Sequence, residues 1–422
     1  AGSSLALQIP EGDGDVEVLA PLDQRALDAY RAGIAQLVDG QVDAGVTALR
    51  AVANAARTAG DRLSSAWILW RTADALGARG EWSRALDVLS AAVDAAREDA
   101  PLPVRAALRL SEGRFLRRAK RLDEAEAVYR ALLSESGYPG RESLLAAQIL
   151  YWLATLADLK GDAGATASAD EAALRMRERL APASLVAAES WHSIGISALA
   201  RGDFEGAEKA QRRALEIQER RVPGSLLVAK TLTELGIIAD ERSDYDAAEG
   251  FHLRALAIRR EKAEGSKDLA GSLINLGVIA RRRGLLLEAK RYQEEALILS
   301  RKIDPRSTAT AQSLGNLGRV AMDRGDLSSA SDYFEQALEV FQSIDPDSMS
   351  VAYTWANLAA VHSLQRDVAG SKEYTDKALA LVRRIAPDSL DLARALESAA
   401  GDRTNSGDFA GARSVVEEAL GP

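Results

Sequence analysis

Three asparagines stand 41 residues apart in the sequence, at Asn275, Asn316 and Asn357. An asparagine side chain carries a hydrogen-bond donor and an acceptor together, so it can bond both backbone groups of an extended peptide whatever the peptide's own side chains. The same spacing continues upstream to Glu234 and Ser193, where the amide is lost. A second interpretation is that the amides join neighbouring parts of the chain through backbone carbonyls. The asparagines therefore predict either a peptide-binding row or a row of internal braces.

Basic residues are expected beside these asparagines, although the chain as a whole is acidic. The repeating register places beside them Lys230, Arg281, Arg282 and Arg319, with Tyr353 further along. Such a local basic surface favours a carboxylate-rich peptide or segment as the ligand. Acidic residues on the same helix faces could instead neutralise the arginines internally, namely Asp240, Glu241 and Asp323. We predict a partner-binding surface made of Lys230, Asn275, Arg281, Arg282, Asn316, Arg319, Tyr353 and Asn357.

The residues that usually carry catalysis are scarce. The sequence has no cysteine, which excludes a thiol nucleophile, a disulfide framework, a zinc finger and an iron–sulfur site within it. It contains no phosphate-binding P-loop, no dinucleotide-binding glycine motif and no H-E-x-x-H zinc motif. Its histidines, His192, His252 and His362, occupy different positions of the repeat described below. We expect no enzymatic activity, no cofactor and no metal site.

Composition narrows the remaining classes of function. The 422 residues carry a formal charge of −9, which argues against a nucleic-acid-binding protein. No apolar run approaches the roughly 18 residues that a membrane-spanning helix needs. No signal peptide opens the sequence, so we expect a cytoplasmic location and no membrane partner.

The elements that position these residues follow from an internal repeat of 41 residues. An Ala-Leu pair recurs at residues 173, 214, 255, 296, 337, 378 and 419, and a Leu-Gly pair recurs in step at residues 235, 276 and 317. Within one repeat, Ser225 is expected to cap a first helix, and Ser243 with Asp244 to end it and begin a second. Gly236 removes a side chain where the two helices cross. One such hairpin cannot bury its own apolar face, so neighbouring hairpins must stack.

The whole chain is accordingly predicted to be all-α. We expect about ten antiparallel helix hairpins over residues 21–422, forming one continuous solenoid. Residues 1–20 differ, because apolar and polar residues alternate on either side of a Gly-containing turn. They are expected to be either a short β-hairpin or an extended segment.

The Leu-Gly, Gly-Asp and Ala-Leu pattern resembles the tetratricopeptide repeat over about 95% of the chain. The 41-residue spacing with Pro-x-Ser between repeats is similar to the arrays of kinesin light chains and of many bacterial signalling proteins. Strings such as Leu273-Ile274-Asn275-Leu276-Gly277 look like the arrays that precede caspase-like CHAT protease domains in bacteria. The resemblance implies a right-handed α-solenoid whose first helices line a concave face. It also implies a protein or peptide partner, with the asparagines bonding the partner's backbone.

Two functions follow from this resemblance. The first is an interaction scaffold that captures an extended, acidic protein segment in its groove. The alternative is a regulatory region that controls a fused effector, such as a CHAT protease domain, beyond residue 422. The last hairpin has no following helix, so the natural chain is expected to continue. The hairpin itself is expected to fray or self-associate through Leu396, Val415, Val416 and Leu420.

Overall fold

The computed structural model describes residues 24–96, 100–138, 140–387, 389–405 and 407–420. In these residues all regular structure is α-helical, and the 20 helices follow one another in pairs. None of them is long and apolar enough to cross a membrane. The helices divide into two compact units, which meet in sequence at Arg221 and Val222. The all-α prediction and the number of hairpins are confirmed.

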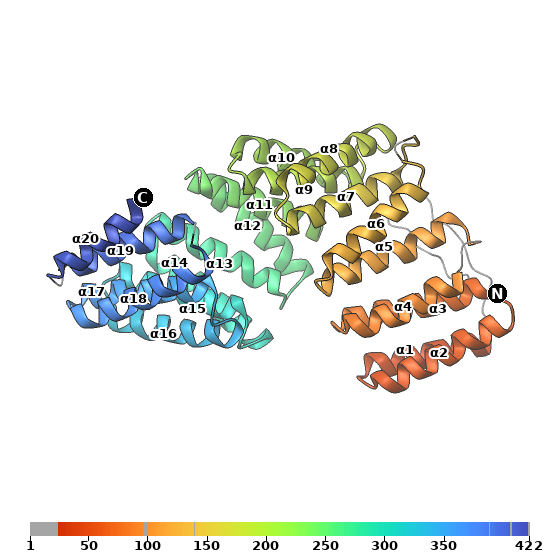
Figure 1. Cartoon of the computed structure of the whole chain (residues 1–422), viewed down its shortest axis with the longest axis horizontal. Helices are drawn as coiled ribbons and strands as arrows, with labels where there is room; N and C mark the ends of the chain where they lie inside the picture. Colours follow the sequence, from red (N-terminus) through yellow and green to blue (C-terminus); the bar gives the residue numbers. More distant parts are fainter. Residues whose placement is uncertain (1–23, 97–99, 139, 388, 406, 421–422) are drawn as a thin grey trace. The chain divides into compact units, whose positions relative to one another are not determined.

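Unit 1 contains ten helices: α1 (Gln24–Val38), α2 (Val42–Thr58), α3 (Arg62–Ala78), α4 (Trp82–Ala96), α5 (Leu102–Arg118), α6 (Leu122–Glu135), α7 (Leu144–Leu159), α8 (Ala163–Leu180), α9 (Leu185–Ala200) and α10 (Phe204–Arg221). Unit 2 contains the other ten: α11 (Leu226–Glu241), α12 (Tyr245–Lys262), α13 (Lys267–Arg282), α14 (Leu286–Ile303), α15 (Thr308–Asp323), α16 (Leu327–Ile344), α17 (Met349–Leu364), α18 (Val368–Ile385), α19 (Leu390–Asn405) and α20 (Phe409–Leu420). Within each unit successive helices run antiparallel and lie side by side (Figure 1).

The turns between helices are fixed by side-chain caps, as the repeat predicted. The hydroxyl of Ser225 accepts a hydrogen bond from the backbone amide of Val228 at 3.4 Å and so begins α11. The Asp244 carboxylate accepts from the amide of Ala247 at 3.1 Å and begins α12. Each cap satisfies a backbone donor that the helix leaves free at its start. Serine caps recur before α7, α9, α13 and α15, and aspartate caps before α8, α16 and α18.

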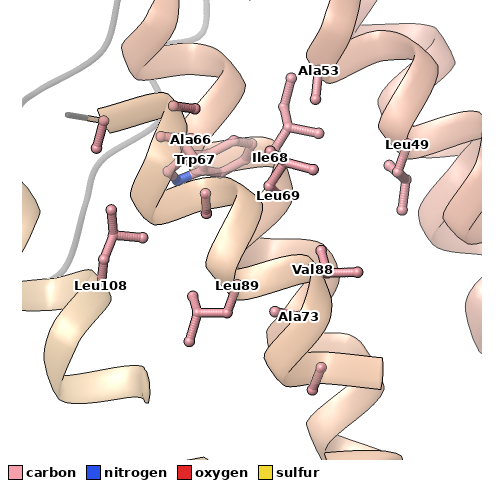
Figure 2. Packing of buried hydrophobic residues seen from close by; sticks show 14 of the residues in the cluster. Leu49, Ala53, Ala66, Trp67, Ile68, Leu69, Ala73, Val88, Leu89 and Leu108 are labelled. Atoms are coloured by element: carbon pink, nitrogen blue, oxygen red, sulfur yellow. The ribbon is translucent and has the colours of Figure 1, made fainter. Parts of the chain in front are cut away.

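Neighbouring hairpins share one apolar core. In unit 1 the buried side chains of Leu49, Ile68, Leu89 and Leu108 come from α2, α3, α4 and α5 and belong to a single cluster (Figure 2). Trp67 joins them and is only 7% exposed. Since these helices belong to three successive hairpins, the stacking that the sequence required is present.

The repeated glycines let the two helices of a hairpin approach closely. A Cβ atom at Gly318 in α15 would lie 2.7 Å from the ring of Phe334 in α16, and the Phe334 side chain is fully buried. The equivalent glycines at 195, 236 and 277 face Gln211, His252 and Gln293, each 16 residues further on. The glycine of the Leu-Gly pair is therefore required by packing.

We expect the substitution Gly318→Ala to destabilise unit 2. Alanine gains about 1 kcal/mol of helix propensity over glycine, but forcing a methyl group into a packed ring contact costs about 1–3 kcal/mol. Chemical unfolding monitored by circular dichroism measures the net effect. Gly250→Ala in α12 is the matched control, because nothing lies within 4 Å of that Cβ position and the change should stabilise the helix. Equal stabilisation by both changes would contradict the close contact.

The last hairpin is better covered than the sequence predicted. Leu396 and Val415 were expected to be uncovered, yet they are 3% and 1% exposed and pack with Leu379 and Ala399. Leu379 belongs to α18, so the preceding hairpin helps α19 and α20 to bury these two side chains. Val416 remains 46% exposed, as expected. The side chain of Leu420 lies outside the described residues.

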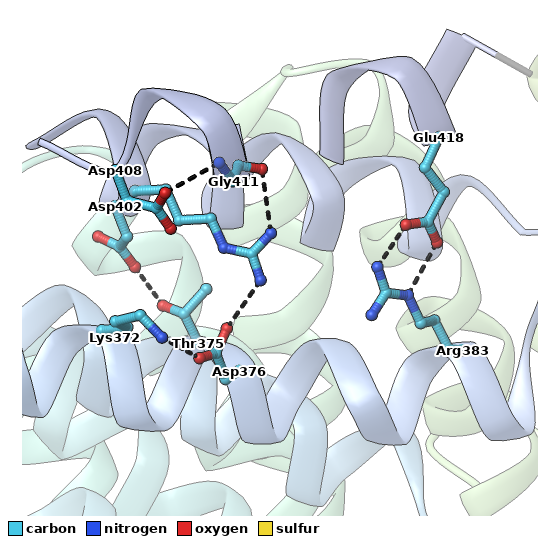
Figure 3. Close-up of polar contacts among 9 residues, drawn as sticks. Lys372, Thr375, Asp376, Arg383, Asp402, Asp408, Gly411 and Glu418 are labelled. Carbon is cyan, nitrogen blue, oxygen red and sulfur yellow. Dashed lines mark hydrogen bonds and ion pairs between the residues drawn. The ribbon is translucent and has the colours of Figure 1, made fainter. Parts of the chain in front are cut away.

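Polar contacts also tie this hairpin to α18 (Figure 3). The Arg383 guanidinium makes two hydrogen bonds to the Glu418 carboxylate, one of them at 2.8 Å. The Thr375 hydroxyl donates to the Asp402 carboxylate, and Arg403 donates to the Asp376 carboxylate at 3.3 Å. These bonds join α18 to both α19 and α20.

Two further predictions about the domain organisation of the chain are not tested by the structure. Residues 1–20, expected to form a hairpin or an extended segment, lie outside the described residues. A single continuous solenoid over residues 21–422 stays a prediction.

Candidate functional site

The first helices of three successive hairpins, α13, α15 and α17, surround a hollow of about 330 Å³ in unit 2. We call this hollow the unit 2 groove. The 41-residue spacing returns each helix to the same orientation, so residues one repeat apart meet on one wall. Five of the eight predicted partner-binding residues line it: Asn275, Asn316, Arg319, Tyr353 and Asn357.

The three asparagines come from the middle of α13, α15 and α17 and are half-buried. Their side-chain amides make no hydrogen bond with any residue that the structure describes. Each amide therefore presents an unused donor and an unused acceptor to the groove.

Arg319 is the cation of the groove. Its side chain is half-buried, and within the described parts of the chain no carboxylate or hydrogen-bond acceptor pairs with it. Burial lowers the pKa of the guanidinium, the nearby charges of Arg281 and Arg282 lower it further, and Asp323 opposes them. The guanidinium still carries its charge at neutral pH, because arginine titrates far above it.

The other predicted cations do not line the groove. Arg281 pairs with Asp323 at 2.9 Å, and Arg282 pairs with Asp240 at 3.0 Å. These are the internal ion pairs that the sequence offered as an alternative, and they join successive first helices. Lys230 in α11 is exposed and lies outside the groove lining.

Tyr353 stands at one side of the groove with 45% of its surface exposed. Partial burial raises the pKa of its phenol, and the nearby Asp391 carboxylate raises it further.

One and two repeats before Asn275, the equivalent positions hold Glu234 and Ser193 in place of asparagine. Glu234, one repeat before Asn275, is half-buried, and burial raises the pKa of its carboxyl against the effect of Lys230 and Arg259. In unit 1, Ser193 donates to the Asp170 carboxylate at 3.1 Å. Neither residue presents a free amide.

The sequence reasoning missed Gln312, an exposed side chain of α15 that lines the groove. A signal for it was present, because Gln312 lies 41 residues before Tyr353. Its amide offers the same donor and acceptor as the asparagines.

The histidines do not gather at one place. In the parts of the chain that are described, no group of three or more histidine, aspartate or glutamate side chains could hold a metal ion. His192 bonds Gln211 at 2.8 Å, and His362 bonds Asp367 at 2.8 Å. His252 is buried against Gly236, and burial, assisted by the charge of Arg259, lowers its pKa from 6.5 to about 4.

His252 should therefore weaken the fold as the pH falls. Because the unfolded chain takes up the proton near pH 6.5 and the folded chain near 4, the free energy of unfolding falls as pH falls between these values. The contribution is about 1 kcal/mol between pH 7 and pH 5.5. We expect His252→Gln to abolish it, since Gln293 at the equivalent position donates to the Ile274 carbonyl at 2.9 Å.

Urea unfolding of both proteins at several pH values checks this expectation. Comparing the two removes the contribution of other groups, such as the buried carboxyl of Asp170, whose pKa burial raises to about 6. Parallel losses of stability in the variant and the parent would show that His252 is not held neutral.

Comparisons with known proteins agree with the helical-repeat fold. Residues 186–261 and 268–343, which hold α9 to α16, match a family model described as the tetratricopeptide repeat. The chain is similar in fold to the apo form of RapI, with 15% sequence identity, a TM-score of 0.60, and coverage of 86% of this chain and 99% of that one. No curated protein sequence gives a significant match.

Two further structures are similar over about half of the chain. BtubC (BKLC) from P. vanneervenii has 23% identity and a TM-score of 0.46, covering 51% of this chain and 89% of its own. A protein from Podosopora anserina, described as a kinesin light chain with nearly identical TPR-like repeats, has 15% identity and a TM-score of 0.43, covering 49% and 99%.

Proposed function

This chain is an array of tetratricopeptide repeats, a class of protein-interaction scaffold, and from that premise we propose that the unit 2 groove binds an extended, acidic segment of a partner protein. The asparagines would bond the backbone of the segment. Arg319 would pair with a carboxylate on it.

The observation that carries the proposal is the unpaired charge of Arg319. A half-buried guanidinium without a partner loses hydration and gains nothing in return. Its neighbours Arg281 and Arg282 each have a carboxylate within 3.0 Å, so carboxylates are used on this face wherever the chain itself provides them. A carboxylate from a partner would complete Arg319 with a charge-assisted hydrogen bond.

The unused amides support an extended conformation for the segment. If Asn275, Asn316 and Asn357 served as internal braces, their side chains would bond neighbouring carbonyls, and among the described residues they do not. A row of such amides at regular spacing suits the regular backbone of an extended peptide. Because the backbone is common to all peptides, the charge of Arg319 would supply the preference for acidic ligands.

A displayed library of random peptides tests the proposal without knowledge of the natural partner. Selection on the intact protein should enrich acidic sequences, and these should fail to bind a variant that combines Asn316→Ala with Arg319→Met. The matched control combines Asn54→Ala in α2 with Arg324→Met, which makes the same chemical changes outside the groove. Enriched peptides that bind all three proteins equally would overturn the proposal.

A further inference from the structure

Helices α13 and α15 each contain two glycines of different character. A Cβ atom at Gly277 or Gly318 would collide with the side chain opposite, at 2.3 Å from Gln293 and 2.7 Å from Phe334. At Gly271 and Gly315, in the same two helices, nothing lies within 4 Å of the Cβ position and φ is not positive. Glycine is less favourable than alanine inside a helix. Neither packing nor backbone geometry therefore explains these two glycines.

Both of these glycines open onto empty space. Gly315 lines the unit 2 groove. Gly271 lines a second hollow of about 370 Å³ between α13, α14 and α15, which we call the α13–α15 hollow. The two spaces adjoin, because Ile274 and Gln312 line both of them.

The surface of the α13–α15 hollow is mostly hydrocarbon, although Lys267, Thr308 and Gln312 also line it. Its apolar lining residues are Ala270, Ile274, Ile303 and Ala309. Two polar groups in its lining are already engaged: the Ser300 hydroxyl donates to the Ala296 carbonyl at 2.7 Å, and the Ser307 hydroxyl accepts from the Thr310 amide at 3.3 Å. A side chain entering this space would find apolar partners.

We propose that Gly271 and Gly315 are specificity-determining residues. Because they lack side chains, they leave the surface of α13 and α15 open. The partner segment then continues from the unit 2 groove into the α13–α15 hollow and places an apolar side chain there. This inference rests on the proposed function of the groove. The occupant is one segment with two features, an acidic group at Arg319 and an apolar side chain over Gly271. The charge of Arg319 favours a segment with an acidic group, and the continuity of the two spaces allows the same segment to reach both.

The test replaces each glycine with leucine, a strong helix former whose side chain would fill the space. The probe is an acidic peptide from the displayed library. Gly271→Leu and Gly315→Leu should each weaken its binding by at least about tenfold, through a clash with the ligand alone. Gly250→Leu, in open space on α12, is the matched control and should bind like the parent.

Thermal unfolding separates loss of binding from loss of fold. Gly271→Ala and Gly315→Ala should melt at a higher temperature than the parent, since alanine meets no neighbour there. If the alanine variants melt lower, the open space is absent and the inference fails. If the leucine variants melt at or above the parent's temperature and bind normally, the inference also fails.

The peptide supplies the second half of the test. An alanine scan should find one apolar residue whose loss weakens binding to the parent by about tenfold but has little effect on Gly271→Leu, as expected when the two changes remove one contact. Peptides that need Arg319 and Asn316 yet tolerate all three leucine variants would refute this inference and leave the proposed function standing. Peptides that ignore Arg319 and Asn316 would refute the proposed function itself.

Discussion

Replacing Arg319 with methionine is expected to weaken the binding of an acidic peptide by about tenfold to hundredfold and to leave the fold at least as stable. A hydrogen bond to a charged group contributes about 1.5–3 kcal/mol, and each 1.4 kcal/mol is about tenfold in affinity. Methionine keeps an unbranched, flexible stem in place of the arginine's and removes a half-buried charge that has no partner among the described residues. Binding and stability should therefore move in different directions.

Titration calorimetry at low and high salt measures the binding half of this prediction. The loss caused by Arg319→Met should be larger at low salt, because salt screens the attraction between partly exposed charges. Arg324→Met is the control, since Arg324 is an exposed residue at the end of the same helix and lies outside the groove lining. A loss of equal size at both salt concentrations would mean that Arg319 packs against the ligand without pairing.

Asn316→Ala is expected to weaken the same peptide by about 1–3 kcal/mol, because the bound backbone would lose its hydrogen-bond partner in a place with little water. The free energy of unfolding should change by less than about 0.5 kcal/mol, as is usual where no internal contact is lost. The structure provides the reason, since the Asn316 amide bonds no residue among those described.

Both quantities should be measured on one preparation of the variant, by calorimetry and by urea unfolding. Asn54→Ala in α2 is the control for the same chemical change outside the groove. The opposite order, with stability lost and affinity kept, would mean that the asparagines brace the hairpins.

The sequence predicted the hairpins closely because their boundaries depend on local chemistry. Ser225 and Asp244 cap α11 and α12 where the repeat placed them. Gly236 lies against His252 as Gly195, Gly277 and Gly318 lie against the residues 16 positions further on, so the helices of these four hairpins cross at the same point. Such features recur in each repeat, so one repeat supports the interpretation of the next.

The sequence could not decide which charges remain free. The sequence places Arg281, Arg282 and Arg319 on one face. Only the fold shows that Asp323 lies next to Arg281 and Asp240 next to Arg282, so that these two arginines are paired. The sequence also misjudged Leu396 and Val415, because burial there depends on how α20 folds back over α18 and α19. Gly271 and Gly315 escaped notice since they lie outside the repeated pattern.

The asparagines offer the most direct test of the groove. Only two others, Asn54 and Asn405, occur in the sequence, so selective 15N labelling of asparagine gives a small set of side-chain amide signals in a nuclear magnetic resonance spectrum. On addition of a library-selected acidic peptide, the side-chain signals of Asn275, Asn316 and Asn357 should shift together, and that of Asn54 in unit 1 should stay. If the peptide binds while the three groove signals remain in place, the segment lies elsewhere and the central claim is wrong.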